Sequence, residues 1–92
     1  MTKYTVVPTS EYKRNRKKAE KRGLDMDFLD WIVAELADGK TLPQKHKDHK
    51  LKGDRRGDRE CHITPDWLLI YRYENDELLL VLRELNSHSN LF

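Results

Sequence analysis

Histidine is the side chain in this sequence best suited to moving protons near neutral pH. The chain carries four of them, His46, His49, His62 and His88. Imidazole is the side chain whose ordinary pKa lies near neutrality, so it can serve as a general acid or a general base. A single histidine is more commonly a surface residue or a hydrogen-bonded core residue. Its position in the chain therefore has to decide between these uses.

His62 has the most informative position. It lies in an expected strand in which Cys61 and Ile63 point to one face and His62 to the other, because side chains alternate along a strand. If Cys61 and Ile63 face the helices, His62 faces the open side of the sheet. Asp66 and Trp67 follow across a tight turn, close enough to share a site with His62. Asp66 could equally be a turn-forming residue, and Trp67 could pack in the core.

A metal site is a competing use of the same side chains. Cys61, His62, His49 and Asp66 are all capable ligands. Cys61 and His62 are adjacent in a strand and point apart, however, and the sequence contains neither H-E-x-x-H nor C-x-x-C. We therefore expect neither a bound metal ion nor any other cofactor.

Metal-free cleavage of RNA is one reaction that these residue types fit. It needs a base to take the proton of the 2′-OH, an acid to protonate the leaving 5′-oxygen, and positive charge near the phosphate. Arg83 and the basic residues between positions 40 and 59 can supply that charge, while Trp67 and Phe92 offer flat faces for an unpaired base. Spacing alone does not select RNA cleavage over other acid–base chemistry.

The composition indicates a folded domain with a very polar surface. The chain has 92 residues, of which 37% are apolar and 37% charged, and its net charge is +2. Its apolar residues cluster at 67–71 and 78–82, unlike those of a disordered chain, and the length favours one domain spanning residues 1–92. A single cysteine, Cys61, excludes an intrachain disulfide, and no segment resembles a signal peptide or reaches the ~18 residues of a membrane span. We therefore expect a cytoplasmic protein with no membrane partner.

Two helices and a run of strands must position these side chains. The expected elements are a strand at 4–7, a helix from Thr9 or Ser10 to about Arg22, a helix at 27–37, a loop at 39–53, strands at 55–63, 67–74 and 77–85, and residues 88–92 as a short strand or a segment across the sheet. Gly23 and Gly39 are expected to end the two helices, and Asp25 to cap the second. This order predicts an α+β fold, with both helices packed on one face of a mostly antiparallel sheet of about four to five strands.

The first helix is unusually basic. Only Tyr12 and Ala19 form an apolar stripe. The cationic residues are Lys13, Arg14, Arg16, Lys17, Lys18, Lys21 and Arg22. Such a surface attracts polyanions, although it could also be merely solvated.

Three segments resemble the YafQ branch of the RelE/ParE toxin superfamily. They are residues 47–53 (KDHKLKG), 59–71 (RECHITPDWLLIY) and 87–92 (SHSNLF). The resemblance spans nearly the whole chain and implies a compact α+β domain with the RelE-like microbial RNase fold. It also implies a toxin that enters the ribosomal A site and cuts mRNA there, and a cognate antitoxin that covers the active site.

The resemblance also assigns residues to roles. His49, His62, Asp66 and His88 match the family's catalytic positions, with His88 as general acid, Asp66 aided by His62 as general base, and His49 orienting or stabilising the scissile phosphate. The expected substrate-binding residues are Trp67, Phe92, Arg83, Lys47, Lys50 and Arg59. His46 matches no catalytic position, and we expect it at the surface.

Two departures from the family pattern concern the positive charges. The family commonly has R-T-G-S-H before its last histidine, whereas this chain has RELNSH at 83–88. Arg83 is thus one residue further from His88, and the usual glycine is missing. Lys50 stands where the family often has proline, which adds charge beside His49.

Two other functions stay open. A ParE-like toxin of the same fold would inhibit DNA gyrase without cutting RNA, and it is not expected to need the histidines. An RNA-binding module would block translation by occupying the ribosome. The basic first helix suits either ribosomal RNA or the acidic part of an antitoxin, and the sequence does not separate the two.

Overall fold

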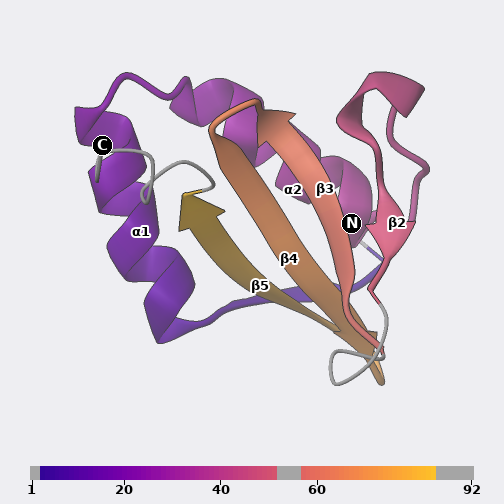
Figure 1. Ribbon diagram of the computed structural model, residues 1–92. Helices are drawn as coiled ribbons and strands as arrows, with labels where there is room; N and C mark the ends of the chain where they lie inside the picture. Colours follow the sequence, from indigo (N-terminus) through magenta and orange to yellow (C-terminus); the bar gives the residue numbers. More distant parts are fainter. Residues whose placement is uncertain (1–2, 52–56, 85–92) are drawn as a thin grey trace.

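The computed structural model describes residues 3–51 and 57–84 of the chain, which form two α-helices, a short 3-10 helix and a five-stranded sheet (Figure 1). In chain order the elements are β1 (Thr5–Pro8), α1 (Ser10–Lys21), α2 (Met26–Ala37), η1 (Gln44–His46), β2 (His49–Lys50), β3 (Arg59–Thr64), β4 (Trp67–Glu74) and β5 (Glu77–Glu84). The strand order is β1-β5-β4-β3-β2, in which β1 runs parallel to β5 and the other neighbours are antiparallel. The predicted α+β fold with a mostly antiparallel sheet is confirmed.

Local sequence signals set both helices. The Thr9 hydroxyl accepts a hydrogen bond from the Tyr12 N–H at 3.2 Å, and the Asp25 carboxylate caps α2 in the same way. Such caps satisfy N–H groups that the first helical turn leaves without partners. Gly23 (φ 93°) and Gly39 (φ 75°) follow the two helices in the left-handed region, where glycine carries no Cβ penalty. The predicted caps and ends are therefore confirmed.

One core joins the helices to a single face of the sheet. Its buried members are Tyr12 and Ala19 of α1, Leu29, Ile32, Leu36 and Ala37 of α2, Leu42, Cys61 and Ile63 of β3, Trp67, Leu69 and Tyr71 of β4, and Leu78, Leu80 and Leu82 of β5. Within β3, β4 and β5 these core residues alternate with residues that face the other way, because strand side chains alternate. The opposite side of the sheet carries Glu60, His62, Leu68, Ile70 and Arg83, and we call it the open face.

The basic helix α1 lies beside the edge of β5, whereas α2 lies behind the sheet in the view of Figure 1. β1 pairs with β5 only as far as Leu80. The carbonyl of Leu80 accepts a hydrogen bond from the Thr9 hydroxyl at 2.7 Å, and that of Leu82 accepts one from the Asn15 amide at 2.7 Å. These contacts occupy acceptors that an edge strand otherwise exposes. A helix with few apolar residues is thus fixed by polar contacts to the sheet edge.

The structure also differs from the predicted elements. β3 begins at Arg59 rather than at position 55, and residues 52–56 lie outside the described part. The expected loop at 39–53 contains η1 and the short edge strand β2. The prediction that His46 lies at the surface was wrong: it is 3% exposed, with its ring 5.6 Å from that of Phe28. Within 3–51 and 57–84, no helix is long and apolar enough to cross a membrane.

Candidate active site

The end of β3 and the turn after it position His62 and Asp66. Cys61 and Ile63 are buried in the core, and His62 between them is half-buried on the open face, as strand parity predicted. The register with β4 shifts between His62 and Thr64, an irregularity that can redirect a side chain near a site. Asp66 is exposed in the turn, where its N–H donates to the Thr64 hydroxyl at 3.3 Å. His62 and Asp66 thus occupy the same end of the sheet.

The edge strand β2 brings His49 to the open face. His49 pairs with Glu60 in the β2–β3 register, so His62, two residues further along β3, is its diagonal neighbour. Diagonal neighbours on one face are roughly 7–8 Å apart. Two histidines that are distant along the chain therefore share one side of the sheet, as the predicted site requires.

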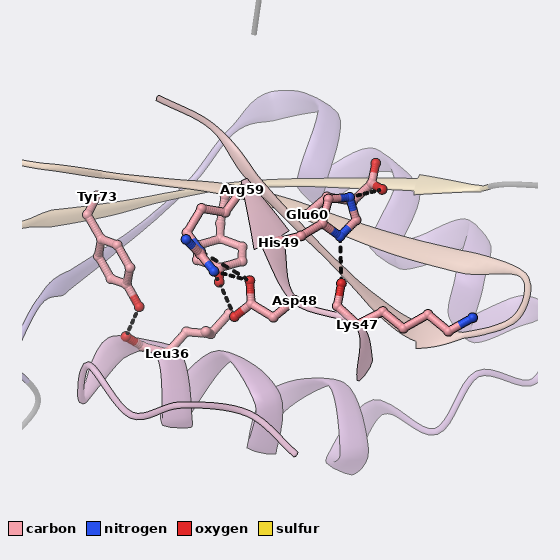
Figure 2. Close-up of polar contacts among 8 residues, drawn as sticks. Leu36, Lys47, Asp48, His49, Arg59, Glu60 and Tyr73 are labelled. Atoms are coloured by element: carbon pink, nitrogen blue, oxygen red, sulfur yellow. Dashed lines mark hydrogen bonds and ion pairs between the residues drawn. The ribbon is translucent and has the colours of Figure 1, made fainter. Parts of the chain in front are cut away.

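Hydrogen bonding fixes the state of the His49 ring (Figure 2). Its Nδ1 lies 2.6 Å from the carbonyl oxygen of Lys47, and its Nε2 lies 3.4 Å from a carboxylate oxygen of Glu60. Because a carbonyl can only accept, Nδ1 carries a hydrogen and Nε2 is the nitrogen that can gain or lose a proton. The imidazole is thus oriented with its exchangeable nitrogen beside a carboxylate.

Glu60 is a residue of this site that the sequence reasoning missed. Its side chain is 20% exposed, and its carboxylate lies 3.4 Å from the Nε2 of His49. The available signal was parity, because Glu60 precedes His62 by two positions in one strand and so points to the same face. A charged residue two positions from a candidate catalytic histidine in a strand is therefore itself a candidate site residue.

Arg59 takes part in a polar cluster on the other side of β3. Its guanidinium lies 3.0 Å from the Asp48 carboxylate and donates to the Tyr71 hydroxyl at 3.1 Å, and that hydroxyl donates to Asp48 at 2.5 Å. Burial of Tyr71, followed by its hydrogen bond to Asp48, raises the pKa of the phenol. The guanidinium of Arg59 thus holds Asp48, next to His49 (Figure 2), and contact of Arg59 with substrate stays a prediction.

Trp67 is buried in this structure, unlike a residue that offers a flat face to a base. Its side chain is 4% exposed and belongs to the core, so the alternative of core packing describes it. Arg83 does lie on the open face, in one row with His62, because both are register partners of Leu68. Its guanidinium donates to Glu11 of α1 at 3.1 Å. Contact of Arg83 with substrate stays a prediction.

The cationic residues of α1 divide into two groups. Arg16 forms a two-pronged ion pair with Asp30 at 2.7 and 3.1 Å, while Lys18 and Arg22 pair with Glu84. The other four, Lys13, Arg14, Lys17 and Lys21, are exposed and recur at three- and four-residue spacing. They form one stripe on the solvent side of α1, since such spacing places side chains on one helix face. We call these four residues the basic stripe.

The remaining predicted residues divide between exposed and undescribed positions. Lys47 and Lys50 are exposed around the start of β2, and their contact with substrate stays a prediction. His88 and Phe92 lie outside the described residues.

In the described ranges, no three His, Cys, Asp or Glu side chains gather in a way that could hold a metal ion. Burial raises the pKa of the Cys61 thiol to about 12, so it is a core residue rather than a nucleophile or ligand.

The chain is similar over nearly its whole length to known bacterial toxins. Residues 4–92 match the family model described as "Bacterial toxin of type II toxin-antitoxin system, YafQ". The "mRNA interferase toxin YafQ" of Escherichia coli K12 is 35% identical over 85 residues, which cover 91% of this chain and 90% of the relative. The toxin in the crystal structure of the E. coli DinJ–YafQ complex is similar with a TM-score of 0.79 and 30% identity, over 97% of this chain and 98% of that one. A metal-bound toxin from Helicobacter pylori gives a TM-score of 0.81 and 37% identity over the full length of both chains.

Proposed function

Because the chain belongs to the YafQ family of bacterial toxins of type II toxin–antitoxin systems, we propose that it is an endoribonuclease that cuts mRNA on the ribosome without a metal and so inhibits translation. The observation that supports this most strongly is the shared open face of His49 and His62, with Asp66 at the same end of the sheet as His62. These side chains come from three separate elements. We propose that they act together as proton-transfer groups around one bound phosphate.

The proposed reaction uses the RNA's own 2′-hydroxyl as nucleophile. Asp66, aided by His62, takes the 2′-OH proton while the oxygen attacks phosphorus. The bond from phosphorus to the 5′-oxygen breaks, His88 protonates that oxygen, and the products are a 2′,3′-cyclic phosphate and a 5′-hydroxyl. In the proposed complex, His49 keeps its Nδ1–H on the Lys47 carbonyl and exchanges the contact of its Nε2 with Glu60 for the phosphate, and Arg83 adds charge on the same face.

The proposed protein partner is an antitoxin that covers the open face. A similar E. coli toxin has been crystallised in a complex named DinJ–YafQ. The basic stripe of α1 lies apart from the histidines and suits phosphates of ribosomal RNA, since such contacts give affinity without sequence choice. The antitoxin would then neutralise the toxin by occupying the site, and the stripe would serve ribosome binding.

Mapping the 5′ ends of mRNA after induced expression tests the proposal. The wild type should produce cuts within translated messages. Asp66→Asn or His62→Ala should lower cleavage by about 10²–10⁴-fold, the usual contribution of a general acid or base. Glu74→Gln is the matched control, because it makes the same carboxylate-to-amide change at the exposed far end of β4.

Three results would contradict the proposal or a part of it. Intact messages together with inhibited DNA supercoiling by purified protein would favour the gyrase-poisoning alternative. Ribosome binding and arrested translation with no new 5′ ends would favour a module that acts by occupancy. Full cleavage by Asp66→Asn, with native circular dichroism, would remove Asp66 from the mechanism.

A further inference from the structure

A hollow beside His62 has no role in the chemistry described so far. It has a volume of about 500 Å³ and is lined by Phe28 of α2, residues 45–47 around η1, and residues 62–65 at the end of β3. Binding sites for small organic groups commonly have volumes of about 300–1,000 Å³ and mostly apolar walls with a few polar groups. We propose that this hollow is a subsite for a nucleobase next to the scissile phosphate; the proposal rests on the proposed function.

The walls of the hollow suit a flat aromatic ring. Phe28 is half-buried, and its ring has two aromatic neighbours. One is His46, and the other is Trp31, whose ring lies 6.2 Å away at an interplanar angle of 11°. Ile63 and Pro65 supply further apolar surface. Proteins commonly hold unpaired bases by stacking them on aromatic side chains. An inserted base would therefore find a stacking partner in Phe28.

His46 gives the hollow a hydrogen-bonding group. Its Nδ1 lies 2.8 Å from the carbonyl oxygen of His62, so the neutral ring carries its hydrogen on Nδ1. Its Nε2 is then an acceptor, and it is buried without a hydrogen-bond partner in the part of the chain that the structure describes. Buried polar atoms normally have partners. An N–H on the edge of a base would supply the missing donor.

Charge and position favour RNA over an apolar peptide. Lys45 and Lys47 are exposed at the rim, where they can pair with the phosphates on either side of the base. His62 lines the hollow, where its carbonyl contacts His46, and by strand parity its side chain points to the open face. In this proposal a base in the hollow therefore lies across β3 from the reacting phosphate. The hollow would then set which bases flank the cut.

Direct binding tests the subsite without any need for cleavage. The probe is a short single-stranded 2′-O-methyl RNA, which has no free 2′-OH to attack, with one abasic position moved along it. For the wild type, one abasic position should weaken binding roughly fivefold or more, the loss expected when one stacked base is removed. In Phe28→Leu, the abasic site at that position should no longer weaken RNA binding. In His46→Gln, it should weaken RNA binding less than in the wild type.

Val6→Ala is the control, since Val6 is 36% exposed in β1 and does not line the hollow. It should retain the wild-type abasic profile. The same profile in Phe28→Leu and the wild type would overturn the subsite. Unchanged RNA binding with weakened antitoxin binding by Phe28→Leu would also overturn it, and would make a protein the occupant.

Cut-site mapping separates this proposal from the proposed function. If the wild type cuts mRNA, Phe28→Leu should still cut but with a flatter base preference around the cut. Cleavage at the same bases and in the same proportions would refute the subsite and leave the nuclease intact. If the wild type cuts nothing, the proposed function fails, and the abasic series alone decides the subsite.

Discussion

Removal of the Tyr71 hydroxyl should cost this small domain a large part of its stability. The hydroxyl is buried, donates to the Asp48 carboxylate at 2.5 Å and accepts from Arg59 at 3.1 Å. Hydrogen bonds to charged groups contribute about 1.5–3 kcal/mol, so Tyr71→Phe should lower the free energy of unfolding by about 2 kcal/mol. For a domain of this size that corresponds to a fall in Tm of about 8–16 °C.

Urea unfolding followed by circular dichroism measures this loss, and Tyr73→Phe provides the matched control. The Tyr73 hydroxyl donates to the neutral Leu36 carbonyl at 2.7 Å, so its removal should cost only about 1 kcal/mol. A double-mutant cycle of Tyr71→Phe with Asp48→Asn should give a coupling of about 1 kcal/mol or more. Equal losses for the two tyrosines, together with no coupling to Asp48, would refute the assignment of a charged cluster.

The other predictions concern the sheet edge, the buried acids and the basic stripe. Asn15→Ala should lower the free energy of unfolding by about 1 kcal/mol in urea titrations, because it exposes an edge carbonyl of β5. The Cys61 thiol, with a pKa of about 12, should react with a thiol-specific dye only after unfolding. Burial raises the pKa of Cys61 and Tyr73 to about 12 from ordinary values of 9.0 and 10.0, so stability should be complete below pH 9 and fall as the pH rises toward 12, as urea midpoints measure. The double variant Lys17→Gln/Lys21→Gln should bind ribosomes with a shallower dependence of log affinity on log salt concentration. The slope should fall by roughly one for each phosphate contact that is lost.

The sequence was sufficient wherever a signal was local. Caps and glycines marked both helices within a residue or two, because these residues satisfy or end the helix by themselves. Strand parity placed His62 on the open face, because alternation needs no knowledge of the partner strand. The strands predicted at 67–74 and 77–85 leave only residues 75–76 for the turn between them, and Asn75 takes the left-handed conformation there with φ 57°.

Side chains whose surroundings come from distant segments were not predictable in this way. Burial of His46 depends on Phe28 and on the carbonyl of His62, neither of which is near it in sequence. Arg59 resembles the other basic residues between positions 40 and 59 until β3 and β4 bring it against Tyr71. In both cases the polar residue type indicated a side chain in solvent. Tertiary contacts instead supplied hydrogen-bonding partners that offset the cost of removing His46, and part of Arg59, from water.

The segment from His46 to His49 shows how the core-facing side of the sheet can control the open face. A two-residue strand such as β2 contributes too few ladder hydrogen bonds to hold a register firmly. Here His46 is attached to the His62 carbonyl, and Asp48 to Arg59 and Tyr71, so the segment is fixed on both sides of Lys47. Lys47 adopts the left-handed conformation (φ 51°), and its carbonyl reaches the Nδ1 of His49. The contacts of His46 and Asp48 on the core-facing side therefore position the Lys47 carbonyl that sets the tautomer of His49. A substitution in the cluster of Asp48, Arg59 and Tyr71 should thus alter proton transfer by His49 on the open face, although the cluster does not lie on that face.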